Sequence, residues 1–314
     1  MKGYAEIILS VLPVLSLFVL GYILQTIRFF SQSSIQDLKK LVLSIALPAL
    51  LFIAFSQLEF QYSFLAIVGL VFTLCIVMVL IGKALAKPLK IASPYFPLML
   101  GGFETGMLGY AIFISVYGMQ EVDKLAIVDL GQVIFVFFVL MALLIKLRDG
   151  AQNSRQLLTM FLTSPVIIAI FAGIFVSLVK RMVDFSDHQL YAYLMNLATM
   201  LGNLTVPLIC LSIGYELKLN FQTLRLSIQT ILVRKILLLS FAIFMNKVVF
   251  VNILHLPPIY EYAVLTMFLL PPPFVIALFL KQDDSENQQY VGNTLSLSTV
   301  LSIGVFLIVS IFYQ

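Results

Sequence analysis

Long apolar stretches follow one another along almost the whole chain, separated by short charged clusters and by Pro or Gly breaks. A helix needs roughly 20 apolar residues to cross a bilayer core about 30 Å thick. By that measure the pattern predicts ten membrane-spanning helices, five in each half of the chain. We expect them at residues 4–27, 35–57, 62–85, 94–118, 124–145, 157–179, 190–216, 226–250, 260–280 and 288–312.

The fourth and ninth expected spans carry residues that interrupt helices. The ninth contains the three consecutive prolines 271–273, which remove three backbone donors, so a continuous helix cannot pass through them. The fourth contains the glycine-rich run 101–110, where the spacing of Gly102 and Gly106 fits either an unwound segment or close helix packing. Interrupted backbone persists at membrane depth only where protein or a watery cavity covers it, and the free N–H groups at helix N-termini favour anions. We therefore expect a site for a small anion at these breaks.

An internal repeat relates the two halves of the chain. Pro13 and Gly21 of the first span recur as Pro165 and Gly173 of the sixth, a shift of 152 residues. The second and seventh spans each carry one proline near their middle. Because five spans separate the copies, an odd number, the second copy is upside down in the membrane. Inverted repeats of this kind place the substrate site near the midplane of secondary transporters.

The predicted fold is an all-α polytopic membrane protein of ten helices in two inverted five-helix repeats, with broken helices 4 and 9 crossing. One transporter domain covers residues 1–314, with the repeats at 1–150 and 151–314. If the spans alternate, one side of the membrane holds twelve Lys and Arg residues and the other side, with both termini, holds five. The positive-inside rule makes the side with twelve cytoplasmic, so both termini are expected outside a plasma membrane.

Composition supports a membrane protein and excludes several function classes. Hydrophobic residues make up 61% of the chain and charged residues 11%, far outside the soluble range. The basic residues lie in short clusters between apolar runs, which disfavours nucleic-acid binding. No phosphate-binding loop occurs, so transport is expected to use a gradient rather than ATP. Cys75 and Cys210 lie inside apolar runs without metal-ligand spacing, and we expect neither a metal nor a cofactor.

Charged residues inside the expected spans are the leading functional candidates. Glu104 lies near the middle of the fourth span, where a lone charge costs about 2.5–3.5 kcal/mol and must be protonated, paired or wetted. Arg234 and Lys235 are adjacent in the eighth span, so they cannot both face the same partner. We expect Lys235 to snorkel to the membrane edge. Arg234 is expected either to pair with Glu104 or to face a carboxylate ligand, which suits its guanidinium.

Uncharged polar residues supply further candidates. Asn203 and Asn293 lie in or beside the seventh and tenth spans, where their amides either line a cavity or bond helix to helix. Asp129 and Gln132 are one helical turn apart in the fifth span, and a wetted helix end is their expected place. The substrate-binding residues expected from the sequence are Glu104, Thr105, Asn203, Arg234, Pro272 and Asn293.

A family resemblance covers essentially the whole chain and rests on residues 13–21, 46–52, 101–110, 164–169, 206–214, 233–237 and 271–273. Together these segments resemble the auxin efflux carrier family, which includes plant auxin carriers and bacterial malate and malonate permeases. The resemblance implies ten helices in two inverted repeats, a central site where the fourth and ninth cross, and a homodimer. Similar members place an Asn near Glu104 and a Pro near Tyr110, so this sequence departs from the family pattern at the crossing. A carboxyl in place of an amide adds a titratable group, which indicates proton coupling.

The sequence therefore predicts a secondary carrier for a small organic anion, a di- or monocarboxylate such as malate. It would work by alternating access, with Arg234 attracting the carboxylate and Glu104 carrying the proton. The expected partners are this anion and the lipid bilayer. Two other classes stay open, an anion channel and a membrane-embedded ligand sensor. A membrane enzyme is disfavoured because no nucleophile and base gather at one depth.

Overall fold

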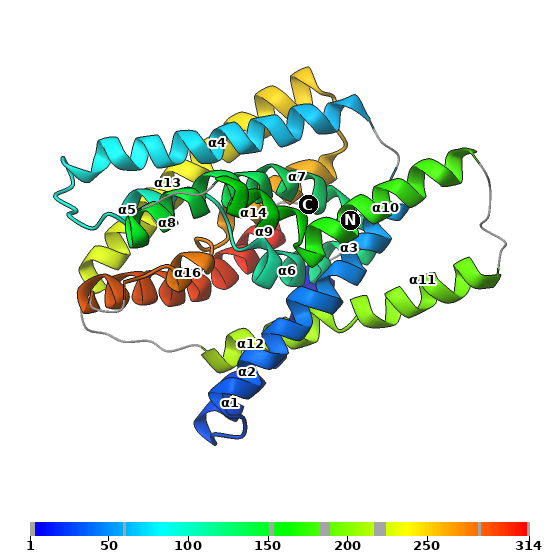
Figure 1. Ribbon diagram of the computed structural model, residues 1–314, viewed down its shortest axis with the longest axis horizontal. Helices are drawn as coiled ribbons and strands as arrows, with labels where there is room; N and C mark the ends of the chain where they lie inside the picture. Colours follow the sequence, from blue (N-terminus) through cyan, green and yellow to red (C-terminus); the bar gives the residue numbers. More distant parts are fainter. Residues whose placement is uncertain are drawn as a thin grey trace. The chain divides into compact units, whose positions relative to one another are not determined.

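The computed structural model describes residues 4–58, 61–150, 154–182, 189–216, 224–281 and 284–312. Within these ranges every regular element is a helix, and no strand occurs (Figure 1). The chain divides into two compact units, and each unit takes segments from both halves of the sequence. The first unit comprises Met1–Gln61, Gly106–Ala126 and Met160–Leu217, and the second comprises Tyr62–Thr105, Ile127–Thr159 and Lys218–Gln314.

The first unit is a set of helices in which segments from opposite halves of the sequence pack together. Helix α1 lies along α12, and α3 packs against α10 and α11. Three elements, η2 (Thr105–Gly109), α7 (Val122–Phe135) and α9 (Ser154–Leu162), contain boundaries between the units. The elements within the first unit are α1 (Tyr4–Thr26), α2 (Gln32–Leu41), η1 (Val42–Ala46), α3 (Leu47–Ser56), α6 (Tyr110–Tyr117), η3 (Met119–Glu121), α10 (Pro165–Met182), α11 (Gln189–Gly202) and α12 (Thr205–Glu216).

The repeated glycines bring helix backbones close together in this unit. A Cβ on Gly21 of α1 would lie 2.3 Å from the carbonyl oxygen of Leu211 on α12. A Cβ on Gly173 of α10 would lie 2.7 Å from the carbonyl oxygen of Phe52 on α3. Because side chains cannot occupy either space, glycine is needed at both positions. The glycine that recurs between the halves therefore has the same packing role in each.

The second unit contains the interrupted helices. Helix α13 packs against α5, α14 and α16, and α4 packs against α5. The elements within this unit are α4 (Tyr62–Ala86), α5 (Phe96–Leu100), η4 (Val136–Leu140), α8 (Met141–Asp149), α13 (Leu224–Phe244), η5 (Met245–Ile253), α14 (Pro258–Leu269), α15 (Val275–Leu278) and α16 (Ser285–Phe312).

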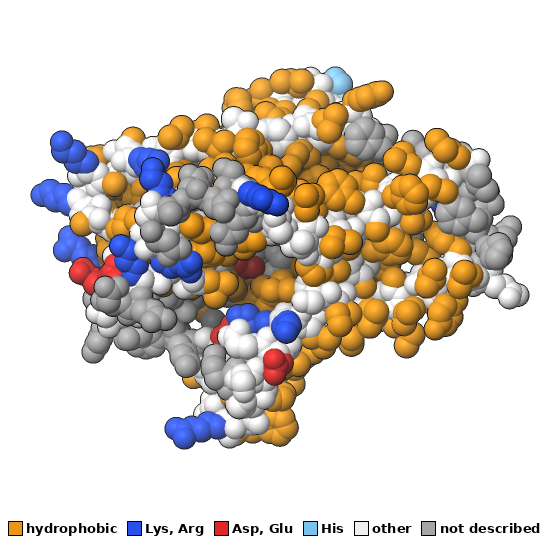
Figure 2. Space-filling view, viewed as in Figure 1, with side chains coloured by type: hydrophobic (Ala, Val, Ile, Leu, Met, Phe, Trp, Pro, Cys, Tyr) orange, Lys and Arg blue, Asp and Glu red, His pale blue; other side chains and the backbone are white. Residues whose placement is uncertain are grey.

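Many large apolar side chains face outward. Hydrophobic side chains cover most of the face drawn in Figure 2, and Phe175, Met200 and Ile236 are each more than 60% exposed. Such a surface is stable in lipid and costly in water. Six described stretches are long and apolar enough to cross a membrane: Ser33–Ser56, Tyr62–Ala86, Phe96–Tyr117, Met119–Arg148, Gln189–Glu216 and Leu224–Ile253.

The remaining expected spans correspond to shorter or less apolar helices, so the count of ten stays a prediction. Apolar helical stretches of 10–17 residues occur at Leu12–Thr26, Pro165–Lys180 and Pro258–Leu269. Helix α16 covers the tenth expected span. Residues 1–3 and 313–314 lie outside the described residues, and the outward placement of the termini also stays a prediction.

Two expected spans differ from the sequence prediction at prolines. The sixth was expected to start at residue 157, but α9 ends at Leu162 and α10 begins at Pro165. Proline lacks an N–H and disfavours helical backbone at the preceding residue, so it starts a helix here rather than continuing one. The seventh was expected to continue through Pro207, but a turn at Asn203 divides it. Pro207 lies in the first turn of α12, where its missing N–H has no intrahelical partner to lose.

Candidate functional site

Both predicted helix interruptions are present in the second unit. Helix α5 ends at Leu100 and η2 begins at Thr105, so residues 101–104 are not helical. Helix α14 ends at Leu269 and α15 begins at Val275, with the three prolines between them. The prolines break the ninth span as expected. In the fourth span, where unwinding and close packing were both open, the backbone unwinds.

The two irregular segments bond directly to each other, and we call residues 101–104 and 270–274 the crossing. The Glu104 N–H donates to the carbonyl oxygen of Pro271 at 3.0 Å. The Oε2 atom of Glu104 accepts a hydrogen bond from the N–H of Phe274 at 2.5 Å. The Phe103 ring stacks on Phe268, with centroids 5.2 Å apart and an interplanar angle of 8°. Glu104 therefore joins the two broken helices through both its main chain and its side chain.

Gly102 allows the crossing to form. Its φ of +76° lies in the left-handed region that side chains with a Cβ rarely adopt. A Cβ at this position would also lie 2.8 Å from Cγ of Pro273 in the facing segment. Glycine is therefore needed here for both backbone conformation and space.

Two buried polar residues of α7 support the first segment of the crossing. The Phe103 N–H donates to Oε1 of Gln132 at 3.2 Å, and Nε2 of Gln132 donates to Oδ1 of Asp129 at 2.8 Å. Both side chains are only 5% exposed. The predicted wetted helix end is therefore wrong for this pair. The spacing of three residues between two polar side chains in an apolar helix was the sequence signal for a contact between Asp129 and Gln132. Their backbone partner, Phe103, lies in a distant segment, so no local pattern indicates it.

Arg234 binds the end of α5. Its Nη1 donates to the carbonyl oxygens of Met99 at 2.8 Å and Leu100 at 2.6 Å, and its Nη2 donates to that of Gly102 at 2.6 Å. The guanidinium also lies over the Phe103 ring, 5.1 Å from its centroid, and the residue is completely buried. The last carbonyls of a helix lack intrahelical partners and carry the negative end of its dipole. Arg234 supplies both the missing hydrogen-bond donors and a positive charge at the end of α5. A contact between Arg234 and the substrate stays a prediction.

Lys235 has the equivalent position at the end of α14. Its Nζ donates to the carbonyl oxygen of Leu269, the last residue of that helix, and to the hydroxyl of Ser302 on α16 at 3.0 Å. The expectation that it snorkels to the membrane edge is therefore wrong. The carbonyl exposed by the proline break attracts the ammonium inward.

The other expected site residues are divided between the units. Thr105 is fully buried at the start of η2, and its hydroxyl has no hydrogen-bond partner among the described residues. Pro272 is buried in the crossing, and Asn293 is 7% exposed on α16, which packs against α13, α14 and α15. Asn203 is exposed in the first unit, in the turn between α11 and α12. The structure thus brings Glu104, Pro272 and Arg234 together at the crossing, while the binding roles of all six stay predictions.

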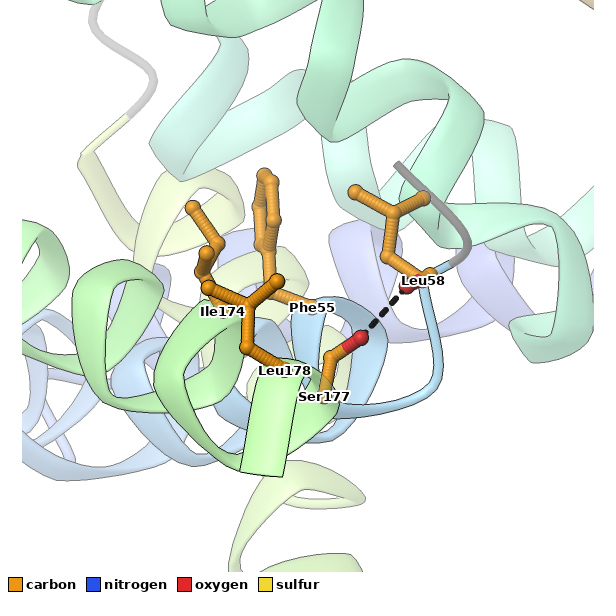
Figure 3. Close-up of a pocket in the computed structure, with 5 residues that line it drawn as sticks. All are labelled: Phe55, Leu58, Ile174, Ser177 and Leu178. Atoms are coloured by element: carbon orange, nitrogen blue, oxygen red, sulfur yellow. Dashed lines mark hydrogen bonds between the residues drawn. The ribbon is translucent and has the colours of Figure 1, made fainter. Parts of the chain in front are cut away.

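A cavity of about 270 Å³ in the first unit is unsuited to a carboxylate (Figure 3). The close-up shows one polar side chain among its lining residues, Ser177, whose hydroxyl donates to the Leu58 carbonyl at 2.6 Å. A charge placed there would lack partners, which is costly. Among the described residues, no three His, Cys, Asp or Glu side chains gather in a way that would hold a metal ion. The lining residues of the cavity are Phe55, Leu58, Ile174, Ser177 and Leu178.

Comparison with known proteins gives two similarities. A family described as membrane transport protein matches residues 6–313 of the chain. A protein of Methanocaldococcus jannaschii described as an uncharacterized transporter is 24% identical over 216 residues, which cover 66% of this chain and 68% of that protein. The family match extends over segments of both units, including both parts of the crossing.

Proposed function

Since the chain belongs to the membrane transport protein family, the auxin efflux carriers that its sequence resembles, we propose that it is a secondary active transporter of a small organic anion. The substrate class is a malate-like carboxylate, and the mechanism is alternating access in the plasma membrane. The observation that carries the proposal is the crossing, where Glu104 joins two broken helices inside an apolar unit. Interrupted helices of this kind form the substrate sites of secondary transporters.

The arrangement of the units supports two inverted five-helix repeats. The two longest segments of the first unit, Met1–Gln61 and Met160–Leu217, come from corresponding parts of the two halves, and α1 packs on α12 as α10 packs on α3. The recurring glycines, Gly21 and Gly173, serve both contacts. A repeat-related pair of broken helices is then expected, and the proposed pair is the fourth and ninth spans.

The contact between Glu104 and Phe274 supports a link between proton and substrate binding. The Phe274 N–H, freed by the prolines, is bound by the Glu104 carboxylate. A substrate carboxylate is an acceptor of the same kind and would compete for this N–H. Protonation weakens Glu104 as an acceptor and removes its negative charge, so it would favour entry of the anionic substrate. In this proposal Glu104 carries the proton, and Arg234 provides positive charge beside the site.

Uptake of radiolabelled malate into proteoliposomes holding the purified protein tests the function. We expect saturable uptake that an imposed inward proton gradient increases. Flux that rises linearly with malate concentration would favour the anion channel. Malate binding without flux would favour the ligand sensor, and other small carboxylates measured in the same vesicles would test the substrate class.

Replacing Glu104 with Gln is expected to abolish the effect of the proton gradient on uptake. The Gln side chain keeps an oxygen acceptor for the Phe274 N–H but cannot bind and release a proton. The measurement is malate uptake at equal and unequal pH across the vesicle membrane. The matched control is Glu216→Gln, which removes a partly exposed carboxylate paired with Lys39 in the first unit. Gradient-driven uptake by Glu104→Gln would show that another group carries the proton.

A further inference from the structure

The side chains of two adjacent basic residues on α13 bind the ends of two different broken helices. Arg234 donates to the carbonyls at the end of α5, and Lys235 donates to the Leu269 carbonyl at the end of α14. Consecutive residues of an α-helix point about 100° apart, so neighbours reach different partners. One helix therefore supplies a positive charge to the C-terminal end of both helices that meet at the crossing.

The oxygens around Lys235 resemble those that bind a metal cation. The Leu269 carbonyl has lost its intrahelical partner and carries the negative end of the α14 dipole. The second oxygen is the Ser302 hydroxyl, which is fully buried. Discontinuous helices of secondary transporters use such C-terminal carbonyls to coordinate the coupling cation. In this chain an ammonium group lies there instead.

No carboxylate neutralises this ammonium within the described part of the chain. No ion pair joins Lys235 to a described Asp or Glu within 4.0 Å. Its positive charge is therefore stabilised by the dipoles of a backbone carbonyl and a hydroxyl, which are the kinds of oxygen that also bind Na⁺.

We propose that Lys235 is a built-in substitute for a coupling cation. Its ammonium takes the position of a monovalent ion between the end of α14 and Ser302, so transport does not require Na⁺. Lys235 is a positioning residue that sets ion specificity, and its removal leaves a site that a small cation fills. The part of this inference that concerns flux rests on the proposed function, whereas the cation site is a property of the folded chain.

The substrate-free test is thermal unfolding of purified Lys235→Ala in detergent. The probes are NaCl, n-propylammonium chloride and tetramethylammonium chloride at equal ionic strength. The first two cations bind carbonyl and hydroxyl oxygens, while tetramethylammonium has no N–H to donate and is too large. We expect the Tm of Lys235→Ala in tetramethylammonium chloride to lie below that of the wild type. NaCl or n-propylammonium chloride should restore more than half of this difference. The wild type is expected to have the same Tm in all three.

Two further variants separate ion binding from loss of packing. Lys247→Ala removes an exposed ammonium from η5, which continues α13, and its Tm should not depend on the cation. Lys235→Arg keeps a positively charged side chain at the site, so its Tm should not depend on which cation is added. If Ala lowers the Tm and neither cation restores it, or if Arg is as unstable as Ala, Lys235 has only a structural role and the proposal is wrong.

Uptake measurements then test the consequence for transport. Wild-type malate uptake is expected to be equal in sodium, potassium and choline media. Lys235→Ala is expected to lose uptake by about tenfold to 100-fold and to regain it with Na⁺ or n-propylammonium, because displacing α14 misplaces the crossing. Sodium-dependent wild-type uptake, or full activity of the Ala variant in choline, would overturn the inference. Absence of wild-type malate uptake together with the expected pattern of Tm values would instead refute the proposed function and leave the cation site intact.

Discussion

Arg234→Met is expected to abolish transport and to destabilise the second unit. The Met side chain fills similar space but leaves the carbonyls of Met99, Leu100 and Gly102 without the donors they have now. Each buried acceptor left unsatisfied costs about 1–3 kcal/mol, so the total destabilisation is several kcal/mol. Because these carbonyls fix the start of the crossing, the site itself is displaced. Displacements of about 1 Å lower rates by roughly 100-fold.

Thermal unfolding and malate uptake check this prediction together. The matched control is Arg225→Met, which removes an exposed guanidinium near the start of the same helix. Arg234→Lys keeps the charge but loses the planar fork, so it should recover stability only in part. An Arg234→Met protein that unfolds and transports like the wild type would mean that the three hydrogen bonds are dispensable.

Gly102→Ala is expected to separate the two segments of the crossing. A left-handed conformation costs about 1–2 kcal/mol once a Cβ is present, and this Cβ would lie 2.8 Å from the Pro273 ring. The proline backbone is rigid and cannot yield easily, so the facing segment must shift. The shift weakens the bond between Glu104 and Phe274, and we expect uptake to fall by roughly 100-fold.

Gly292→Ala in α16 is the matched control for this substitution. A Cβ there would meet no atom within 4 Å, and the helical backbone accepts alanine. Alanine in a helix is favoured over glycine by about 0.8–1.0 kcal/mol, so this variant should be as active as the wild type and at least as stable. Equal uptake by the Gly102 and Gly292 variants would show that the contact between Gly102 and Pro273 does not control the site.

Local chemistry made the break in the ninth span predictable from the sequence, whereas the glycine-rich run of the fourth span left unwinding and close packing both open. Three consecutive prolines exclude a continuous helix in any environment, and the run 271–273 does so here. Glu104 was identifiable because a carboxyl in the middle of an apolar span needs a special partner. Helix starts were less predictable, since a single proline either kinks a helix or begins one. Pro165 begins α10, which the span pattern did not indicate.

The partners of the buried polar groups were not predictable, because they belong to distant segments. Gln132 holds the Phe103 backbone, and Arg234 and Lys235 hold the ends of two different helices. Each of these partners is a main-chain carbonyl or N–H group that almost every residue type presents, so the sequence carries no mark of it. What the sequence did indicate was that adjacent Arg234 and Lys235 must face different partners.

The bonds of Arg234 also order the events of synthesis and membrane insertion. Its acceptors Met99 and Leu100 precede it by 135 and 134 residues, so the ribosome completes them long before the arginine exists. Unsatisfied carbonyls are costly in a bilayer, and N-terminal segments emerge first. The nascent end of α5 must therefore remain hydrated, or be held by a chaperone or the insertion machinery, until α13 arrives. Capping of α5 is accordingly a late step, set by the insertion of α13 rather than of α5 itself, and the crossing is completed later still, after residues 270–274 have been synthesised.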